Sequence, residues 1–256
     1  MFRCPSQGYR YSKRIGDIVN NSEITPSLKH SRAKIWFWVI VLLAFDWLIG
    51  RGFTCLVNAA HLNNGTRSYY QTVLVSGINT AIFNFLVHWL LQAIILFLAT
   101  VFVLNRFGIG WRALFGTRFA RIVQWAIIGS LFLVGYQILI SLCGAWALTI
   151  SPDALATPLT FVGLYILRFL PSAFAEEVVY RGGIFTILNT AYGRNKAIVI
   201  SVIIFALGHG YGDWWLMANS IILGIIFTIL YSKTKSLLPG IFAHTLNNVI
   251  HAVIHY

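Results

Sequence analysis

Long apolar runs, separated by short polar segments, dominate the pattern of hydrophobic and polar positions along the chain. Apolar residues follow one another without the alternation of a half-buried strand, which favours helices over a membrane barrel. Most runs approach the ~20 residues that a helix needs to cross a bilayer. The runs lie near 35–57, 81–104, 122–150, 159–181, 196–210, 214–232 and 237–256. The pattern predicts an all-α polytopic membrane helix bundle with about seven transmembrane spans.

The segments between the runs predict the domain organisation. Residues 1–34 are polar and basic, so we expect a cytoplasmic arm there and not a cleaved signal peptide. Residues 35–256 are expected to form a single membrane-embedded domain. The fifth run, 196–210, spans only ~22 Å as a helix, so it crosses a bilayer only with help from its flanks or local thinning.

Composition narrows the class of protein further. The chain is 58% hydrophobic and 10% charged, with a mean hydropathy of +0.74. A soluble domain carries about 25% charged residues, which excludes an ordinary cytosolic enzyme and a disordered protein. Three isolated cysteines exclude a disulfide-built secreted domain, and we expect Cys55 and Cys143 to be small packing residues.

The charge balance predicts orientation. The chain has 19 Lys and Arg against 7 Asp and Glu, a net charge of +12. The bases gather in the arm 1–34, the connector 105–121 and the turns that contain Arg194 and Lys233. The positive-inside rule then places the amino terminus in the cytoplasm, and the bases need no nucleic-acid partner to explain them. The short loops favour a bacterial plasma membrane.

Acidic residues are rare, and two of them are adjacent in an apolar run. Glu177 and Arg181 are four residues apart, so on a helix they share a face and can pair. Glu176 points about 100° away and is left for another role. Gly182 and Gly183 are predicted to end this span. The alternative is a charge cluster on an interfacial helix, without chemistry.

Two later runs carry imidazoles. His209 stands at the tail of an apolar helix, and His244 and Asn248 share a face, which His251 and His255 continue. Such a polar stripe must face the bundle interior or a wet cavity. The alternative for these residues is hydrogen bonding between helices.

Together these groups suit the activation of water inside a membrane. A carboxylate removed from bulk water is a stronger general base, and an imidazole can hold the same water, donate to an oxyanion or bind a metal. Glu176, His209 and His244 also have the ligand count of a catalytic zinc site. A zinc ion as cofactor and a metal-free glutamate mechanism are therefore both open.

The three motifs Glu176-Glu177-x-x-x-Arg181, Phe205-x-x-x-His209 and His244-x-x-x-Asn248 resemble those of a known family. It is the CPBP (CAAX prenyl endopeptidase and bacteriocin-processing, or Abi) family of intramembrane proteases. The resemblance covers residues 159–256 and implies that the last four spans form the catalytic core. It implies that Glu176 activates water and that His209, His244 and Asn248 complete the site. It also implies supporting roles for Glu177, Arg181 and Phe205.

Other readings of the sequence fit less well. Gly210-Tyr211-Gly212-Asp213 spells the GxGD of presenilin-like aspartyl proteases, with Asp46 as a second acid, but Asp213 is predicted in a turn. We expect Asp46 and Arg168 to have buried partners across helices. The sequence contains neither HExxH nor GxSG, and no repeat that would indicate a transporter. The non-enzymatic alternative is a bacteriocin self-immunity or regulatory membrane protein that acts by protein–protein contact.

The sequence thus predicts an intramembrane endopeptidase that hydrolyses a peptide bond of a membrane-associated substrate in the lipid bilayer. Helix rise places Glu176 and His244 each ~10 Å from the cytoplasmic end of their helices, but His209 ~20 Å from it. The site therefore requires the short fifth helix to tilt or to sit low.

Overall fold

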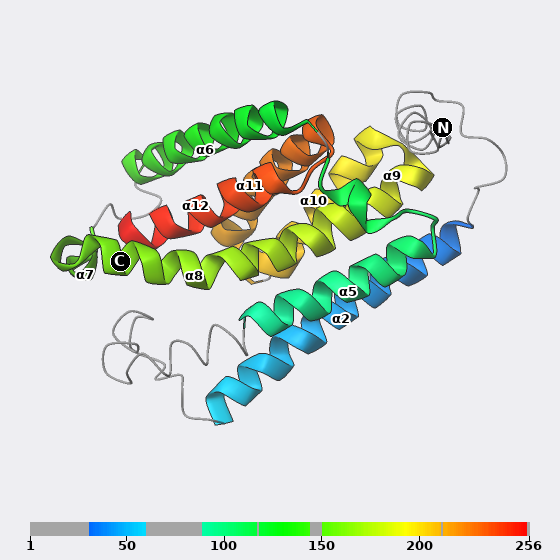
Figure 1. The fold of residues 1–256 in the computed structure, drawn as a ribbon, viewed down its shortest axis with the longest axis horizontal. Helices are drawn as coiled ribbons and strands as arrows, with labels where there is room; N and C mark the ends of the chain where they lie inside the picture. The colour runs from blue at the N-terminus through cyan, green and yellow to red at the C-terminus, as the bar shows by residue number, and fades with distance from the viewer. Residues whose placement is uncertain (1–30, 60–88, 117, 144–149, 211, 255–256) are drawn as a thin grey trace, which may run out of the picture.

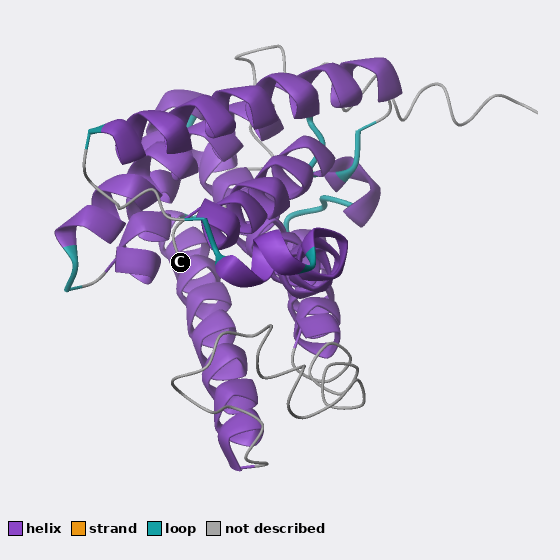
Figure 2. Ribbon diagram, turned by 90° about the vertical axis from the view of Figure 1, so that its left-hand side faces the viewer, coloured by secondary structure: helices purple, strands orange, loops and turns teal. Residues whose placement is uncertain are grey.

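The computed structural model describes residues 31–59, 89–116, 118–143, 150–210 and 212–254. Within these ranges the chain is helical and contains no strand, only an isolated bridge between Phe115 and Ser236 (Figure 2). The arm 1–30, the start of the second predicted run and the end of the third lie outside the described residues. The all-α prediction is confirmed.

Each predicted apolar run contains one main helix. In chain order these are α2 (Arg32–Ala59), α5 (Leu91–Asn105), α6 (Phe119–Leu142), α8 (Pro158–Glu177), α10 (Arg194–Gly210), α11 (Trp214–Thr234) and α12 (Leu238–Ile254). Shorter elements are η3 (Trp111–Leu114), α7 (Pro152–Ala156), the π-helix η4 (Val178–Phe185) and α9 (Thr186–Tyr192).

Four of the described helical segments are long and apolar enough to cross a membrane, namely Arg32–Phe53, Phe119–Leu142, Pro158–Tyr192 and Trp214–Thr234. In the described chain α5 is a shorter apolar helix, and α10 and α12 have 17 residues each. Large apolar side chains such as Phe119, Leu142 and Leu159 are exposed on the outer surface, as lipid contact requires. The chain is an integral membrane protein, and the number of seven spans stays a prediction.

The predicted end of the fourth span at Gly182 and Gly183 is wrong. The helix continues through both glycines as η4 and then as α9, and ends only at Gly193, whose φ of +74° stops it. A Cβ on Gly183 would lie 2.8 Å from Leu42 Cδ1, and one on Gly182 would lie 3.3 Å from Leu114 Cδ2. The glycines therefore serve close packing of this helix against its neighbours.

Helices α2 and α5 lie side by side and pack on η4, whereas α12 packs against both α6 and α8 (Figure 1). The main apolar core surrounds η4, and two smaller cores lie under α12. Cys55 and Cys143 carry free thiols and are exposed, so these two predicted packing residues do not lie in the core. The junction of α8 and η4, next to α10 and α12, holds the polar residues considered next.

Candidate active site

Glu177 ends α8 on the side that faces the protein interior. Its side chain is 1% exposed, and Arg181 Nη1 donates to Glu177 Oε1 at 3.0 Å, as the spacing of four predicts. The Arg181 guanidinium carbon lies 4.2 Å from the centre of the Phe205 ring and 5.2 Å from that of Phe227. The buried ion pair is thus enclosed by aromatic rings, which attract the cation through their faces.

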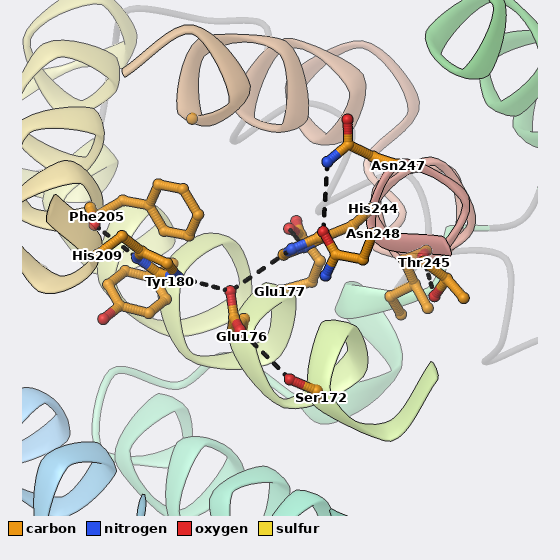
Figure 3. Close-up of polar contacts among 12 residues, drawn as sticks. Ser172, Glu176, Glu177, Tyr180, Phe205, His209, His244, Thr245, Asn247 and Asn248 are labelled. Carbon is orange, nitrogen blue, oxygen red and sulfur yellow. Dashed lines mark hydrogen bonds and ion pairs between the residues drawn. The ribbon is translucent and has the colours of Figure 1, made fainter. Parts of the chain in front are cut away.

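Glu176, the preceding residue, faces α10 and α12. Its Oε2 lies 3.0 Å from His209 Nε2 and 3.7 Å from His244 Nε2 (Figure 3). Three helices that are distant in sequence therefore bring one carboxylate and two imidazoles together. The predicted site residues that had to meet across helices do meet.

The predicted difference in depth between His209 and Glu176 arose because the fourth span was predicted to end too early, at Gly182 and Gly183. Because the helix continues to Tyr192, Glu176 lies ~24 Å from its end, and His209 lies ~22 Å from the start of α10 at Arg194. The α11–α12 turn lies at the level of Gly182 and not at the level of the helix end at Tyr192. Leu237 N donates to Leu114 O there, and Leu237 lies next to Gly182. His244 therefore reaches the same level although it is near the start of α12.

Both imidazoles are oriented through their other nitrogen. His209 Nδ1 donates to the Phe205 carbonyl oxygen at 2.9 Å, and His244 Nδ1 lies 3.2 Å from Glu177 Oε1. A carbonyl or carboxylate can only accept, so each Nδ1 carries a proton. By the same reasoning His209 Nε2 donates to Glu176 Oε2 at 3.0 Å, whereas His244 Nε2 faces that oxygen at 3.7 Å. The same Glu177 oxygen that binds Arg181 thus also orients His244.

Aromatic contacts fix the planes of the two rings. The His244 ring stacks on Phe227 with centroids 4.6 Å apart, and the His209 ring lies 4.2 Å from that of Phe205. Phe205 therefore contacts His209 with both its carbonyl oxygen and its ring, and it also covers Arg181. This is a physical basis for a supporting role of Phe205.

A cavity of about 190 Å³ opens beside Glu176. That volume is well above the ~10–15 Å³ that one water molecule needs. The Glu176 side chain is 23% exposed and that of His209 34%, whereas that of His244 is 6% exposed. The cavity is lined by Gln137, Glu176, Phe205, His209, Leu216, Asn219, Ser220, Leu223, His244, Asn247, Asn248 and His251. Asn248, the last predicted site residue, thus belongs to the same cavity, and His255 lies outside the described residues.

Several polar residues near the site were not predicted. Ser172 Oγ donates to Glu176 Oε1 at 3.4 Å, and its position four residues before Glu176 was a signal that could have found it. Gln137 and Asn247 line the cavity, and a carboxamide inside the apolar run of α6 was a second signal. Asn219 lies on α11, and a single polar residue there did not indicate that its side chain faces the cavity.

Asp46 has a buried partner on another helix, as predicted, and Arg168 lies near aromatic rings. Tyr180 Oη donates to Asp46 Oδ2 at 3.4 Å, which links α2 to η4 near the site. The Arg168 guanidinium carbon lies 5.2 Å from the ring centre of Phe169 and 5.9 Å from that of Trp89.

Asp213 caps α11, since its Oδ1 accepts from the backbone N–H groups of Trp215 and Leu216 at 2.9 and 3.1 Å. Asp213 therefore lies at a turn, as predicted, and Tyr211 of the GxGD sequence lies outside the described residues.

The donor atoms around Glu176 have the chemistry of a zinc site, because each imidazole presents Nε2 while its Nδ1 is held by an acceptor. Their spacing is that of a direct hydrogen bond between Glu176 and His209. In the described part of the chain, no group of three or more His, Cys, Asp or Glu side chains is arranged to hold a metal ion. Zinc binding stays a prediction.

Comparison with known proteins supports the resemblance drawn from the motifs. Residues 158–250 match the family model described as type II CAAX prenyl endopeptidase Rce1-like. Neither a curated protein nor a solved structure matches the chain. The matched segment contains all three motifs and the four helical elements that carry Glu176, Arg181, His209 and His244.

Proposed function

We propose that the chain is an intramembrane protease of the CAAX type, which its residues 158–250 resemble, and that it cleaves peptide bonds with Glu176-activated water. The family supports a membrane-embedded protease in general. The roles of single residues, given below, are the finer part of the proposal. The observation that carries it is the convergence of Glu176 Oε2 with the Nε2 atoms of His209 and His244.

In the first step a water molecule enters the cavity and hydrogen-bonds to Glu176 and His209. Glu176 accepts one proton from it, and the remaining hydroxide oxygen forms a bond to the carbonyl carbon of the substrate. The carbonyl oxygen becomes an oxyanion. Asn248 lines the same cavity, and a hydrogen bond from its Nδ2 would stabilise that charge. His244 would add a second donor when its Nε2 also carries a proton, that is, as an imidazolium.

In the second step the tetrahedral intermediate collapses and the carbon–nitrogen bond breaks. Glu176 returns its proton to the leaving amine, so the carboxylate is regenerated for the next turnover. The products are a carboxylic acid and an amine, and no further reactant is needed. His209 keeps one nitrogen on the Phe205 carbonyl throughout, so its ring does not turn away when water leaves.

In this proposal Glu177 and Arg181 orient His244 and do not react themselves. Arg181 neutralises Glu177 in a buried place, and Glu177 in turn holds His244 Nδ1. A buried carboxylate without its cation would strongly lower the stability of the folded protein. The pair therefore keeps His244 aimed at the cavity without taking part in proton transfer.

A divalent metal stays a second form of the same proposal. Glu176, His209 and His244 would hold it, and it would polarise the substrate carbonyl and make bound water more acidic. Zinc measured in the purified wild type and in His209→Ala decides this point. One zinc per chain, lost in the variant, supports the metal; its absence from a wild type with full activity contradicts it.

The experiment that tests the function uses purified protein in proteoliposomes and a fluorogenic peptide with a farnesylated CAAX terminus. Wild type should release the terminal tripeptide, and Glu176→Gln should not. Asp213→Asn is the matched control, because an asparagine keeps the helix cap. Cleavage by Glu176→Gln at the wild-type rate contradicts the proposal. The same peptide without the farnesyl group tests whether the isoprenoid is recognised.

A self-immunity or regulatory role without proteolysis predicts a different outcome in cells. Glu176→Gln would then keep the cellular phenotype at normal protein levels. If proteolysis is the function, proteomics should show membrane-protein tail fragments that disappear in the same variant. This pair of readouts separates enzyme from interaction protein.

A further inference from the structure

Three carboxamide side chains form a directed chain of hydrogen bonds on one wall of the cavity. Gln137 Nε2, on α6, donates to Asn247 Oδ1 at 2.9 Å. Asn247 Nδ2 in turn donates to Asn248 Oδ1 at 3.3 Å (Figure 3). Gln137 is 1% exposed and Asn247 is 3% exposed. Gln137 lies in the third predicted span, outside the matched residues 158–250.

The direction of these bonds decides which end of Asn248 faces the substrate. A carboxamide carries an acceptor oxygen on one side and a donor nitrogen on the other. Gln137 donates to the Asn247 oxygen, which turns the Asn247 nitrogen to Asn248. The Asn248 oxygen is thereby occupied, and its Nδ2 is the end that remains for the cavity with Glu176 and His244.

We infer that Gln137 is a positioning residue that acts through Asn247 to hold the Nδ2 donor of Asn248 toward the substrate carbonyl oxygen. This inference rests on the proposed function, since it needs an oxyanion at that place. The oxygen and nitrogen of an asparagine amide are nearly equal in shape, so the cavity alone does not select one orientation. An amide turned over would present a partial negative charge to the oxyanion and raise the barrier.

The test replaces Gln137 with Met, which has a similar shape but cannot donate. With the farnesylated reporter in proteoliposomes, kcat should fall on the order of 10-fold and KM should stay within about twofold, because the donor acts mainly in the transition state. Asn248→Ala should lower kcat by about 10²–10³-fold. The double variant should be no slower than Asn248→Ala alone, since Gln137 acts through Asn248. Losses that multiply in the double variant would overturn the relay.

A second variant and a control guard against general damage. Asn247→Asp keeps the shape of the middle link but has no donor for Asn248, so it should reproduce the kcat loss of Gln137→Met. Thr245→Val is the matched control on α12, because the Thr245 hydroxyl donates only within its own helix, to the Ile241 oxygen. Its kcat should equal that of wild type. A loss in Thr245→Val as large as in the other two variants contradicts a specific relay.

A spectroscopic readout separates this inference from the proposed function. In protein labelled with ¹⁵N-asparagine, the side-chain amide signal that Asn248→Ala removes belongs to Asn248. Gln137→Met should shift that signal even if the reporter peptide is not cleaved. If wild type fails to cleave but the signal shifts, only the function fails; an unshifted signal overturns the relay.

Discussion

The two sides of the helix at the α8–η4 junction carry the same residue type in opposite surroundings. On one side Glu177 is 1% exposed and bound by Arg181 and His244. On the other side Glu176 is 23% exposed and opens onto the cavity beside His209. The comparison shows that adjacent glutamates divide into a structural and a reactive residue because the helix turns one toward a fixed cation and the other toward space for water.

The largest expected effect separates the two glutamates directly. Glu176→Gln should lower kcat by about 10²–10⁴-fold, the range of a lost general base, and leave the unfolding midpoint in detergent close to that of wild type. Glu177→Gln should instead lower stability by about 3–5 kcal/mol, because Arg181 is left buried without its counter-charge. Cleavage assays and thermal unfolding of both isosteric variants check this. Equal stability losses in the two would break the comparison.

The two imidazoles provide the next contrast. His244→Gln should lower stability by about 1–3 kcal/mol, because the buried Glu177 oxygen loses a donor. His209→Gln should lower it by less, since that side chain is 34% exposed and its Nδ1 partner is a backbone carbonyl. Both variants should lose most of their activity. Chemical unfolding in mixed detergent micelles measures the difference, and a larger loss in His209→Gln contradicts the assignment.

A substitution at Gly240 tests the buried side of the helix, where Glu177 lies, more directly. A Cβ there would lie 2.9 Å from Glu177 Oε2, a buried oxygen with no hydrogen-bond partner in the described chain. Gly240→Ala should therefore cost about 1–3 kcal/mol and lower kcat, because Glu177 must shift and carries His244 with it. Gly163→Ala in α8 is the control, since no atom of the described residues lies within 4 Å of its added Cβ. That change should stabilise the protein by up to about 1 kcal/mol.

The smallest expected effect is at Asp213, which lies on neither side of the α8–η4 junction. Asp213→Ala should lower stability by about 1 kcal/mol, the value of an ordinary helix cap, with no change in kcat. Asp213→Asn should have almost no effect on either quantity. A kcat loss in either variant, measured with the same reporter peptide, would reopen the reading of Asp213 as a catalytic acid.

Local patterns predicted the parts of the site that lie within one helix. The Glu177–Arg181 pair follows from helical spacing, and so does the shared face of His244 and Asn248. The helix through Gly182 and Gly183 could not be predicted, because the space they leave is filled by Leu42 and Leu114 from distant segments.

Contacts between helices were equally hidden in the sequence. The bond from His244 to Glu177 depends on the register of α12 against α8, and that of Gln137 to Asn247 on the approach of α6. Periodicity shows which residues share a face, but it carries no information on the height at which two helices meet. Packing of the α11–α12 turn on η3 sets that height here.

The π-helical stretch Val178–Phe185 has a consequence for changes in chain length. Helical residues follow one another at about 100°, so deletion of a single residue within this stretch would rotate α8 by that angle relative to α9. Glu176 would leave the cavity, although no site residue had been replaced. The number of residues between Glu177 and Thr186 therefore matters for the reaction as much as their identity.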